Sequence, residues 1–331
     1  MKYAIASAMM LAALLMTGGP AFAASFDCAK AASPREKAIC KNDDLSRDDD
    51  IMGALYTGAR ARMSESAASR LRDSQLSWLR FLDKACLQKG VEDATKCLTP
   101  WYRDRLKFLA DAVTDKADRT FLALDEWEFI APEKKGKEEM PGANRMQYRE
   151  KMSFAIDKPE SEGDKAFNKL VAGETDLWNG FDGEVERSTW FKLNEATPDF
   201  VSLDIFRWEF HVGAAHGFGA ATHVNFRLDK ARPLQVKDIF ATDGWQKVLA
   251  QHSADGFHKI LGDDYALFDE APETIEKMVR DPENWVVTQA GLGVNYPVYS
   301  VGPYAIGDHT VTTPWKDLER WLAKDAVMGV Q

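Results

Sequence analysis

Cysteine and histidine are scarce in this sequence, and basic residues are fewer than acidic ones. Only 4 Cys and 6 His occur among 331 residues, and 42 Lys and Arg are outnumbered by 52 Asp and Glu, for a net charge of −10. Because phosphate contacts need a positive face, we expect no nucleic-acid binding. Walker and Gly-x-Gly-x-x-Gly loops, the Gly-x-Ser-x-Gly elbow and the His-Glu-x-x-His motif are absent. We therefore expect neither an enzyme nor a cofactor.

Long apolar runs are confined to the amino terminus. A basic start precedes the apolar stretch 4–16 and an Ala-x-Ala site at 21–23, a pattern typical of a secretory signal peptide. We expect cleavage between Ala23 and Ala24, which would leave a soluble periplasmic or secreted protein. An uncleaved membrane anchor is the alternative, but the run is shorter than the ~20 residues of a spanning helix. No other segment is apolar enough to span, so we expect no membrane span in the mature protein.

The remaining composition is globular and changes character near residue 115. Hydrophobic residues make up 45% of the chain and aromatic residues 11%, which excludes wholesale disorder. Residues 24–115 contain 16 basic and 15 acidic side chains, whereas residues 116–331 contain 25 and 37. The acidity therefore belongs to the second part. It could attract a basic partner, although solubility alone would also account for it.

All four cysteines, Cys28, Cys40, Cys86 and Cys97, lie in the first third of the chain. An even number of cysteines in an exported protein predicts two disulfides, with three possible connectivities. The short intervals favour the sequential pairing, 28 with 40 and 86 with 97. Zinc is the alternative, disfavoured because no Cys-x-x-Cys pair is present.

The first part has the period of helices. Apolar residues recur at three- and four-residue steps through 52–63, 71–86 and 98–109. A short helix should open at Ser33 and Pro34, and a longer one at Ser46, which acidic residues follow. We expect a bundle of three to four helices stapled by its disulfides.

The second part mixes strand and helix patterns, with a charged loop at Pro132–Gly142. Strands are predicted at 120–130, 148–156, 185–193, 200–212 and 222–228, and helices at 165–178, 245–260, 272–279 and 315–322. Within 200–212 the apolar positions are odd up to Ile205 and even from Phe206 onward. A β-bulge near Ile205, or burial on both faces, would explain this change. We expect an α+β domain with a mainly antiparallel sheet.

Three histidines flank a glycine-rich segment at 213–219. The spacing of His211, His216 and His223 matches no known ligand set, so we expect no bound metal. The glycines permit a tight turn around a buried or half-buried His216, whose simplest role is to satisfy loop backbone groups. A binding role is the alternative, since loops often carry function. Tyrosines at 296–304 could form a contact patch, although such residues more often belong to cores and turns.

The four cysteines of residues 26–110 surround a Gln-x-x-Trp motif. The positions concerned are 26–31, 36–40, Leu45, 75–79, Cys86, Cys97, Leu98, Tyr102, Arg105 and Leu106. This set resembles the LprI-type lysozyme inhibitor N-terminal domain family. The resemblance implies lysozyme as the partner of this part of the chain.

A second resemblance covers about residues 120–322. It is carried by Gly213 to Gly217, the following strand with Asn225, residues 233–240 (PLQVKDIF), and residues 299–315. These positions look like the RsiV-type extracytoplasmic domain, found in a lysozyme-sensing anti-sigma factor and beside some peptidoglycan deacetylases. Ala214 stands where that family usually has a second Gly. The sequence shows neither a sigma-binding part nor a deacetylase domain, so the resemblance implies lysozyme binding without those roles.

Both resemblances lead to one hypothesis. We expect a multidomain protein, with a signal peptide at 1–23, a disulfide-stapled all-α domain at 24–115 and an α+β domain at 116–331. It would bind lysozyme or another basic wall-lytic enzyme and inhibit it by blocking the substrate cleft. Candidate contacts are Asp43, Asp44, Asp48, Asp49, Asp50, His216, Tyr299 and Tyr304. Alternatives are a cell-wall glycan-binding protein without inhibitory activity, whose exposed Trp would stack on sugars, and a metal-dependent envelope enzyme that uses the three histidines.

Overall fold

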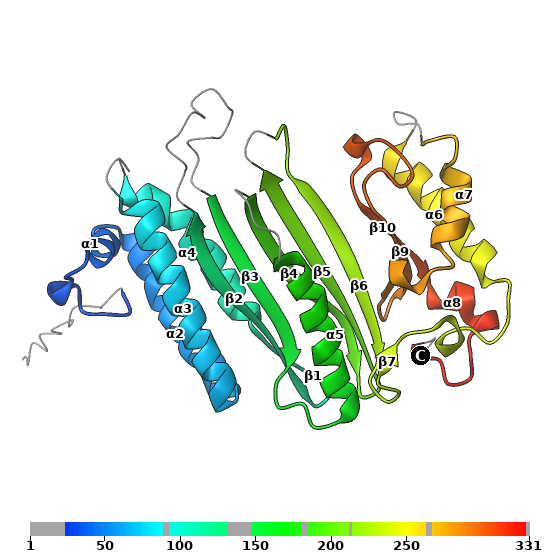
Figure 1. Ribbon diagram of the computed structural model, residues 1–331, viewed down its shortest axis with the longest axis horizontal. Coiled ribbons are helices and arrows are strands. Elements are labelled where there is room, and N and C mark those ends of the chain that lie inside the picture. Colours follow the sequence, from blue (N-terminus) through cyan, green and yellow to red (C-terminus); the bar gives the residue numbers. More distant parts are fainter. Residues whose placement is uncertain are drawn as a thin grey trace, which may run out of the picture.

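The computed structural model describes residues 24–88, 93–130, 147–179, 185–211, 214–262 and 267–328. Figure 1 shows helices at one end of the molecule, a seven-stranded sheet in the middle and a smaller layer at the other end. The expected fold class is confirmed, because a disulfide-linked helical region precedes an α+β region with a mainly antiparallel sheet. The predicted signal peptide and the loop Pro132–Gly142 lie outside the described residues. The division near residue 115 stays a prediction.

Four helices form the first region. They are α1 Pro34–Cys40, α2 Asp43–Arg62, α3 Glu65–Cys86 and α4 Ala94–Asp111. The predicted start of α1 is confirmed, since Ser33 accepts from the Glu36 amide and Glu36 completes a capping box. The predicted start at Ser46 is wrong. Asn42 caps α2 instead by accepting from the Leu45 amide at 2.8 Å, and Ser46 lies buried inside the helix.

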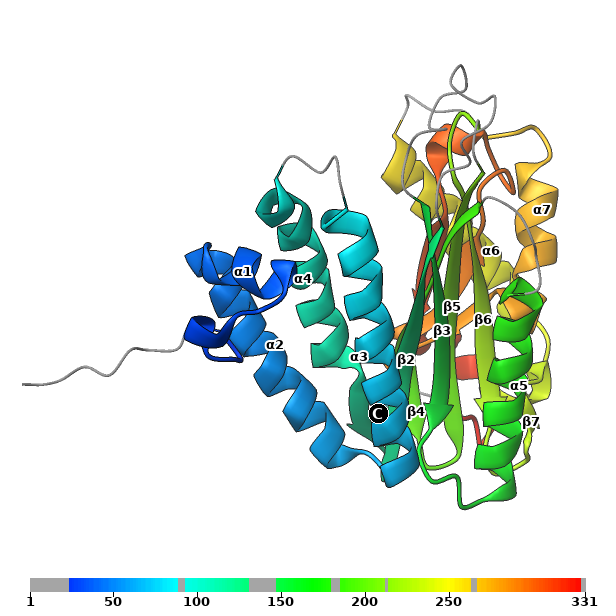
Figure 2. The same cartoon turned by 60° about the vertical axis from the view of Figure 1, so that its left-hand side comes forward.

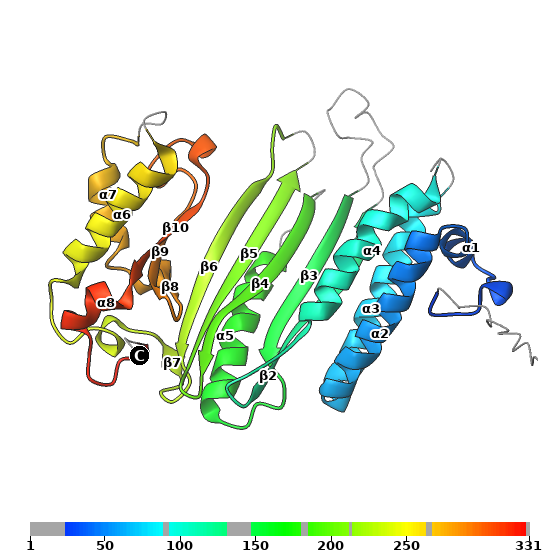
Figure 3. The same ribbon diagram turned by 180° about the vertical axis from the view of Figure 1, so that it is seen from behind.

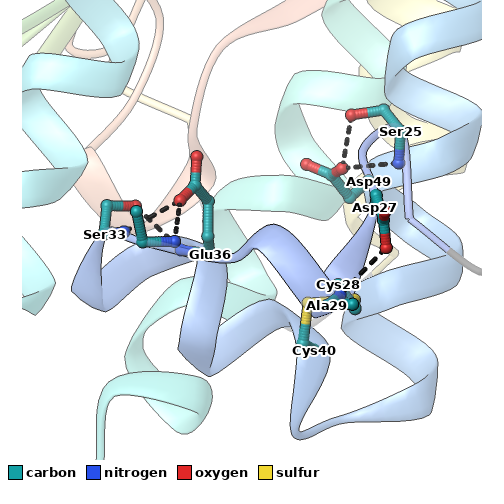
Figure 4. Close-up of a disulfide and its surroundings, with 9 residues drawn as sticks. Ser25, Asp27, Cys28, Ala29, Ser33, Glu36, Cys40 and Asp49 are labelled. Carbon is teal, nitrogen blue, oxygen red and sulfur yellow. Dashed lines mark hydrogen bonds between the residues drawn. A yellow bond between two sulfur atoms is a disulfide. The ribbon is translucent and has the colours of Figure 1, made fainter.

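Each disulfide links two successive cysteines of the chain. Cys28 pairs with Cys40 and Cys86 with Cys97, so the sequential connectivity is confirmed. Figure 4 shows the first disulfide beside the Ser33 cap of α1. It holds the segment around Cys28 against α1. This segment is short and buries little apolar surface, so the covalent link helps to keep it in place.

The large sheet has its strands in sequence order, β1 to β7. They are β1 Val113–Lys116, β2 Arg119–Ile130, β3 Gln147–Ile156, β4 Val185–Thr197, β5 Phe200–His211, β6 Phe218–Arg227 and β7 Arg232–Pro233. Each strand is antiparallel to its neighbour except β3 and β4, which run parallel through the pair Arg149 and Arg187. Helix α5, Glu162–Asn179, packs on one face, where Phe167 and Val171 meet the apolar side chains of the sheet.

The phase change in β5 has a structural reason. Val201, Leu203 and Ile205 face α5, whereas Phe206 lies on the opposite face. Residues 200–205 are all buried, so burial on both faces is confirmed for this half of the strand. The bulge expected near Ile205 is wrong, because the register shift falls in β4 between Leu193 and Glu195.

The smaller layer contains elements that the sequence pattern missed. Its sheet has the order β10-β9-β8, with β8 Trp285–Val287, β9 Gly291–Tyr296 and β10 His309–Pro314. Its helices are α6 Trp245–Leu261, α7 Ala271–Met278 and α8 Trp315–Leu318, the last followed by a 3₁₀ turn to Trp321. They enclose a separate aromatic core in which Phe240 stacks on Trp245, with ring centroids 4.3 Å apart. No helix in the described ranges is both long enough and apolar enough to cross a membrane.

A buried ion pair joins the helices to the large sheet. Arg105 of α4 donates to Asp125 of β2 at 2.5 Å, and each side chain is only 1% exposed. Ser74 of α3 donates to the same carboxylate, and the Trp127 indole N–H does so at 2.6 Å. Helix α3 lies along the part of β2 that β1 leaves uncovered, where Ser77 Oγ accepts from the Trp127 amide at 3.1 Å. Helices and sheet therefore share one polar centre.

The Gln-x-x-Trp motif of the sequence positions this arginine. Gln75 Oε1 accepts from Arg105 Nε at 2.9 Å, and the guanidinium carbon lies 5.4 Å from the Trp78 ring centroid. Tyr102, one turn before Arg105 on α4, packs edge-on against Trp78 at 5.2 Å. The motif thus acts structurally, by supplying a hydrogen bond and an aromatic face to a buried cation.

A second buried polar pair lies within the large sheet. His223 Nδ1 of β6 lies 2.6 Å from Asp204 Oδ1 of β5, and both side chains are 5% exposed. Burial alone would lower the pKa of His223. The hydrogen bond and charge of Asp204, together with the charge of Asp308, outweigh burial, so the pKa of His223 is raised from its usual value.

Removing the carboxylate of Asp125 should strongly destabilise the fold. In Asp125→Ala, Arg105 would be left buried without its counter-charge, and we expect a loss of about 3–5 kcal/mol in the free energy of unfolding. Asp44→Ala, which breaks the exposed pair of Asp44 with Arg47, is the control and should cost less than about 1 kcal/mol. Denaturant unfolding of both variants measures this, and equal small losses would contradict a central role for the pair.

His223 should make stability depend on pH in a defined direction. A raised folded pKa means that the stabilisation is complete below the unfolded value of about 6.5 and is lost as pH rises through the folded value. His223→Gln should therefore cost about 2 kcal/mol near pH 5.5 and clearly less near pH 8.5. The exposed His211→Gln serves as control in the same denaturant titrations. An equal cost of His223→Gln at both pH values would refute the charged pair.

Candidate functional site

The side of the large sheet away from α5 carries a row of aromatic side chains, of which Trp190 is exposed and the others are half-buried. We call Trp190, Phe206, Trp208 and Phe210 the aromatic face. Trp190 of β4 pairs in register with Phe206 of β5, and their rings stack with centroids 5.5 Å apart at an interplanar angle of 12°. Trp208 and Phe210 stack in the same way at 6.3 Å and 11°. Trp190 is 46% exposed, so this surface is open.

A groove adjoins the aromatic face along α4 and has a volume of about 1080 Å³. The α4 wall presents Asp104, Lys107, Phe108 and Asp111, and the β4 wall includes Ser188, Trp190 and Lys192. Glu150, Met152 and Phe154 of β3 form the floor. Figure 3 shows α4 next to β2 and α5 behind the sheet. The groove therefore has a polar wall, an aromatic wall and a mostly apolar floor.

Glu150 gives the floor of the groove a titratable carboxyl group. Burial raises its pKa to about 8, assisted by the negative charges of Asp125 and Asp104, while Arg105 acts in the opposite direction. At neutral pH the carboxyl group is therefore mostly protonated. In that form it can donate one hydrogen bond and accept others.

The predicted contacts His216, Tyr299 and Tyr304 come together at one end of the aromatic face. The His216 ring stacks on Tyr304 with centroids 4.5 Å apart, and Tyr299 lies 5.6 Å from Tyr304. Tyr304 Oη donates to the Gly217 carbonyl at 3.2 Å. Gly217 in turn packs against Trp208, since a Cβ at residue 217 would lie 2.5 Å from Trp208 Nε1. The tyrosine cluster, as we call these three residues, is thus continuous with the aromatic face.

Two features of the tyrosine cluster bear on its role. His216 is exposed, so the expectation that it is buried or half-buried is wrong, although its Nδ1 does lie 2.9 Å from the Gly217 carbonyl. Tyr299 is 57% exposed and has a φ of +65°, in the left-handed region that a bulky residue seldom adopts. Strain of this kind persists where the surrounding structure holds a residue in place, which is common at binding sites.

The predicted acidic contacts do not form one surface with the tyrosine cluster. Asp43, Asp44 and Asp50 are exposed and Asp48 is half-buried on α2. Asp49 is 3% exposed, and Figure 4 shows it bonded to Ser25, whose hydroxyl donates at 2.6 Å; Tyr102 also donates to it, at 3.2 Å. This burial argues against Asp49 as a contact residue. Figure 1 places α2 at the opposite end of the molecule from β9 and β10, which flank the tyrosine cluster.

The three histidines considered as metal ligands have separate partners. His211 is exposed beside Glu209, His216 stacks on Tyr304, and His223 is buried against Asp204. Within the described ranges, no group of three potential ligands is close enough to hold a metal ion.

Sequence reasoning missed the aromatic face and the groove. The sequence signal for the aromatic face was the change of apolar phase in β5. Phe206, Trp208 and Phe210 turn toward the face without α5, where the smaller sheet no longer covers the strand. The groove had no comparable signal, since its walls are far apart in the sequence.

Two solved structures are similar to the chain. One is a member of the DUF3298 family from Bacteroides fragilis NCTC 9343, with 17% identity, 64% of this chain and 96% of that chain covered, and a TM-score of 0.45. The other is a DUF3298 family protein from Pseudomonas aeruginosa PAO1, with 13% identity, 64% and 97% covered, and a TM-score of 0.42. No curated protein matches the chain significantly.

Family models match two separate segments. Residues 237–316 match the model described as protein of unknown function (DUF3298), the domain type found at the C-terminus of RsiV-like proteins. This segment contains α6 to β10 and Tyr299 and Tyr304 of the tyrosine cluster. Residues 28–109, the disulfide-linked helices, match the model described as lysozyme inhibitor LprI. Both resemblances seen in the sequence are thereby confirmed: the chain joins an LprI-type segment to an RsiV-like one.

Proposed function

We propose that this is an exported protein that binds lysozyme and inhibits it by covering the substrate cleft. The match of residues 28–109 to lysozyme inhibitor LprI carries the proposal. The protein would act by binding and not by catalysis. Export is supported by the amino-terminal pattern at 1–23 and by the two disulfides, which form in oxidising compartments.

Charge supports a basic partner. The chain has a net charge of −10, and the acidic excess lies in residues 116–331. Many lysozymes are strongly basic, so long-range attraction would raise their rate of encounter with this protein. Screening by salt should weaken that attraction.

The tyrosine cluster is the contact surface that we favour. Tyrosines on a rigid scaffold often dominate the binding energy of protein interfaces, and Tyr299, at 57%, has the largest exposed fraction of the large apolar side chains in the described residues. An inhibitor needs only to occupy the cleft and keep the catalytic carboxylates of lysozyme away from the glycan. Asp43, Asp44, Asp48 and Asp50 on α2 remain candidates for a second contact through the helical region.

Titration of the purified mature protein into c-type lysozyme tests the function. We expect heat of binding at micromolar concentrations and low salt, together with loss of cell-wall lysis. Binding without loss of lysis would indicate a sensor or scavenger. Absence of binding would exclude c-type lysozyme, and other lysozyme classes would follow. Binding to wall material alone would favour the alternative, a glycan-binding protein without inhibitory activity.

The double variant Tyr299→Ala/Tyr304→Ala tests the contact surface. Removal of two interface aromatics should weaken lysozyme binding at least about tenfold, because hot-spot side chains contribute about 2 kcal/mol or more each. Phe218→Ala is the matched control, since Phe218 is 46% exposed but pairs with Glu209 on the α5 side of the sheet. If both variants inhibit as well as the wild type, the interface lies elsewhere.

A further inference from the structure

We propose that the groove between α4 and β4, together with the adjoining aromatic face, binds an uncharged polysaccharide strand built of pyranose rings, of the kind that forms the glycan of bacterial walls. This activity goes beyond lysozyme binding, because it would attach the protein to the polymer that lysozyme cleaves. It uses residues of α4, β3, β4 and β5 that lie outside the tyrosine cluster.

The aromatic side chains suit sugar rings. Trp190 and Phe206 are nearly parallel, at 12°, and Trp208 and Phe210 at 11°. Residues two apart on a strand lie roughly 7 Å from each other, so the row along β5 repeats at a spacing of the order of a sugar ring. Because the two rings of each pair stack on each other, the C–H face of a pyranose would lie on the outer ring face of a pair, while its hydroxyl groups point outward to polar partners.

The shape of the site favours a slender chain over a globular partner. The groove is hollowed, at about 1080 Å³, and lies between a helix and a sheet. That volume is slightly larger than the roughly 300–1,000 Å³ of pockets for drug-sized ligands, which suits an oligosaccharide of several rings.

The charges of the groove favour a neutral ligand. Lys107 pairs with Asp104 at 2.8 Å, and Lys116 pairs with the buried Glu195 at 2.5 Å. Besides the mostly protonated Glu150, this leaves Asp111 and Lys192 among the lining residues, one charge of each sign. The groove therefore offers no strong field to a polyanion or a polycation.

The same groups provide hydrogen bonds for a sugar chain. Asp111 accepts, Lys192 donates, and the mostly protonated Glu150 on the floor does both. Hydroxyl and acetamido groups require both donors and acceptors, whereas a lipid tail would leave these side chains without partners. The combination of stacking surface and mixed polar groups identifies a glycan as the occupant.

Two glycan probes test this inference in the absence of lysozyme. They are purified peptidoglycan sacculi and the β-1,4-linked tetramer of N-acetylglucosamine. We expect the wild type to sediment with sacculi and to bind the tetramer with little dependence on salt. Trp190→Ala should weaken both at least about tenfold. Trp190→Phe, which keeps a ring at this position, should restore most of the binding, and Phe218→Ala should leave it unchanged.

The outcomes separate this inference from the proposed function. Trp190→Ala should inhibit lysozyme as well as the wild type does, which also shows that the variant is folded. A wild type that inhibits lysozyme but binds neither glycan probe would overturn the inference and leave the proposed function intact. Glycan binding that is insensitive to Trp190→Ala would overturn the assignment to this groove. Glycan binding without any lysozyme binding would support the inference and refute the proposed function.

Discussion

The buried pair of Arg105 and Asp125 is the interaction on which the rest of the arrangement depends. It fixes α4 against β2 from the inside, with Ser74 and Gln75 holding the arginine from α3. Asp104 and Phe108, next to Arg105 on α4, line the groove on the other side. The guanidinium lies 4.5 Å from the Phe108 ring centroid, so the position of this wall follows directly from the ion pair. The buried pair of Arg105 and Asp125, although costly to desolvate, thus fixes the position of the α4 wall of the groove.

Strand β5 sets the other boundary of that surface. Its first half is buried between α5 and the smaller sheet, and the pair of Asp204 and His223 marks the end of the covered part. From Phe206 onward the strand turns aromatic side chains to the uncovered face. One strand therefore supplies both the core of the sheet and its half-buried aromatic row. An apolar face left open in this way, rimmed by polar residues, is typical of interaction sites.

Local chemistry made much of this fold predictable. The cap at Ser33, the sequential disulfides and the longer strands depend on neighbours in the sequence, and the pattern identified them. The start of α2 was misplaced because Asn42 and Ser46 are both residue types that cap helices well, and in the structure Asn42 is the cap while Ser46 is buried within the helix. The strands β8 to β10 were missed because they are short, β9 contains two glycines, and tertiary contacts such as the hydrogen bond from Asn225 of β6 to the Trp285 carbonyl help to hold them. The tyrosine cluster was predicted as separate candidate residues, whereas the groove depends on contacts between residues 104 and 193 that no local pattern encodes.

The position of the tyrosine cluster at the end of the aromatic face links the two proposed activities. A glycan strand in the groove would run toward the surface at which lysozyme is proposed to bind. Lysozyme must approach the same polymer to cleave it, so an inhibitor held on the glycan meets the enzyme at a high local concentration. Attachment would also compensate for a modest intrinsic affinity, because the second binding event becomes effectively intramolecular. The groove between α4 and β4 and the loops that carry the tyrosine cluster use different residues, so a glycan strand in the groove would leave the tyrosines available to lysozyme.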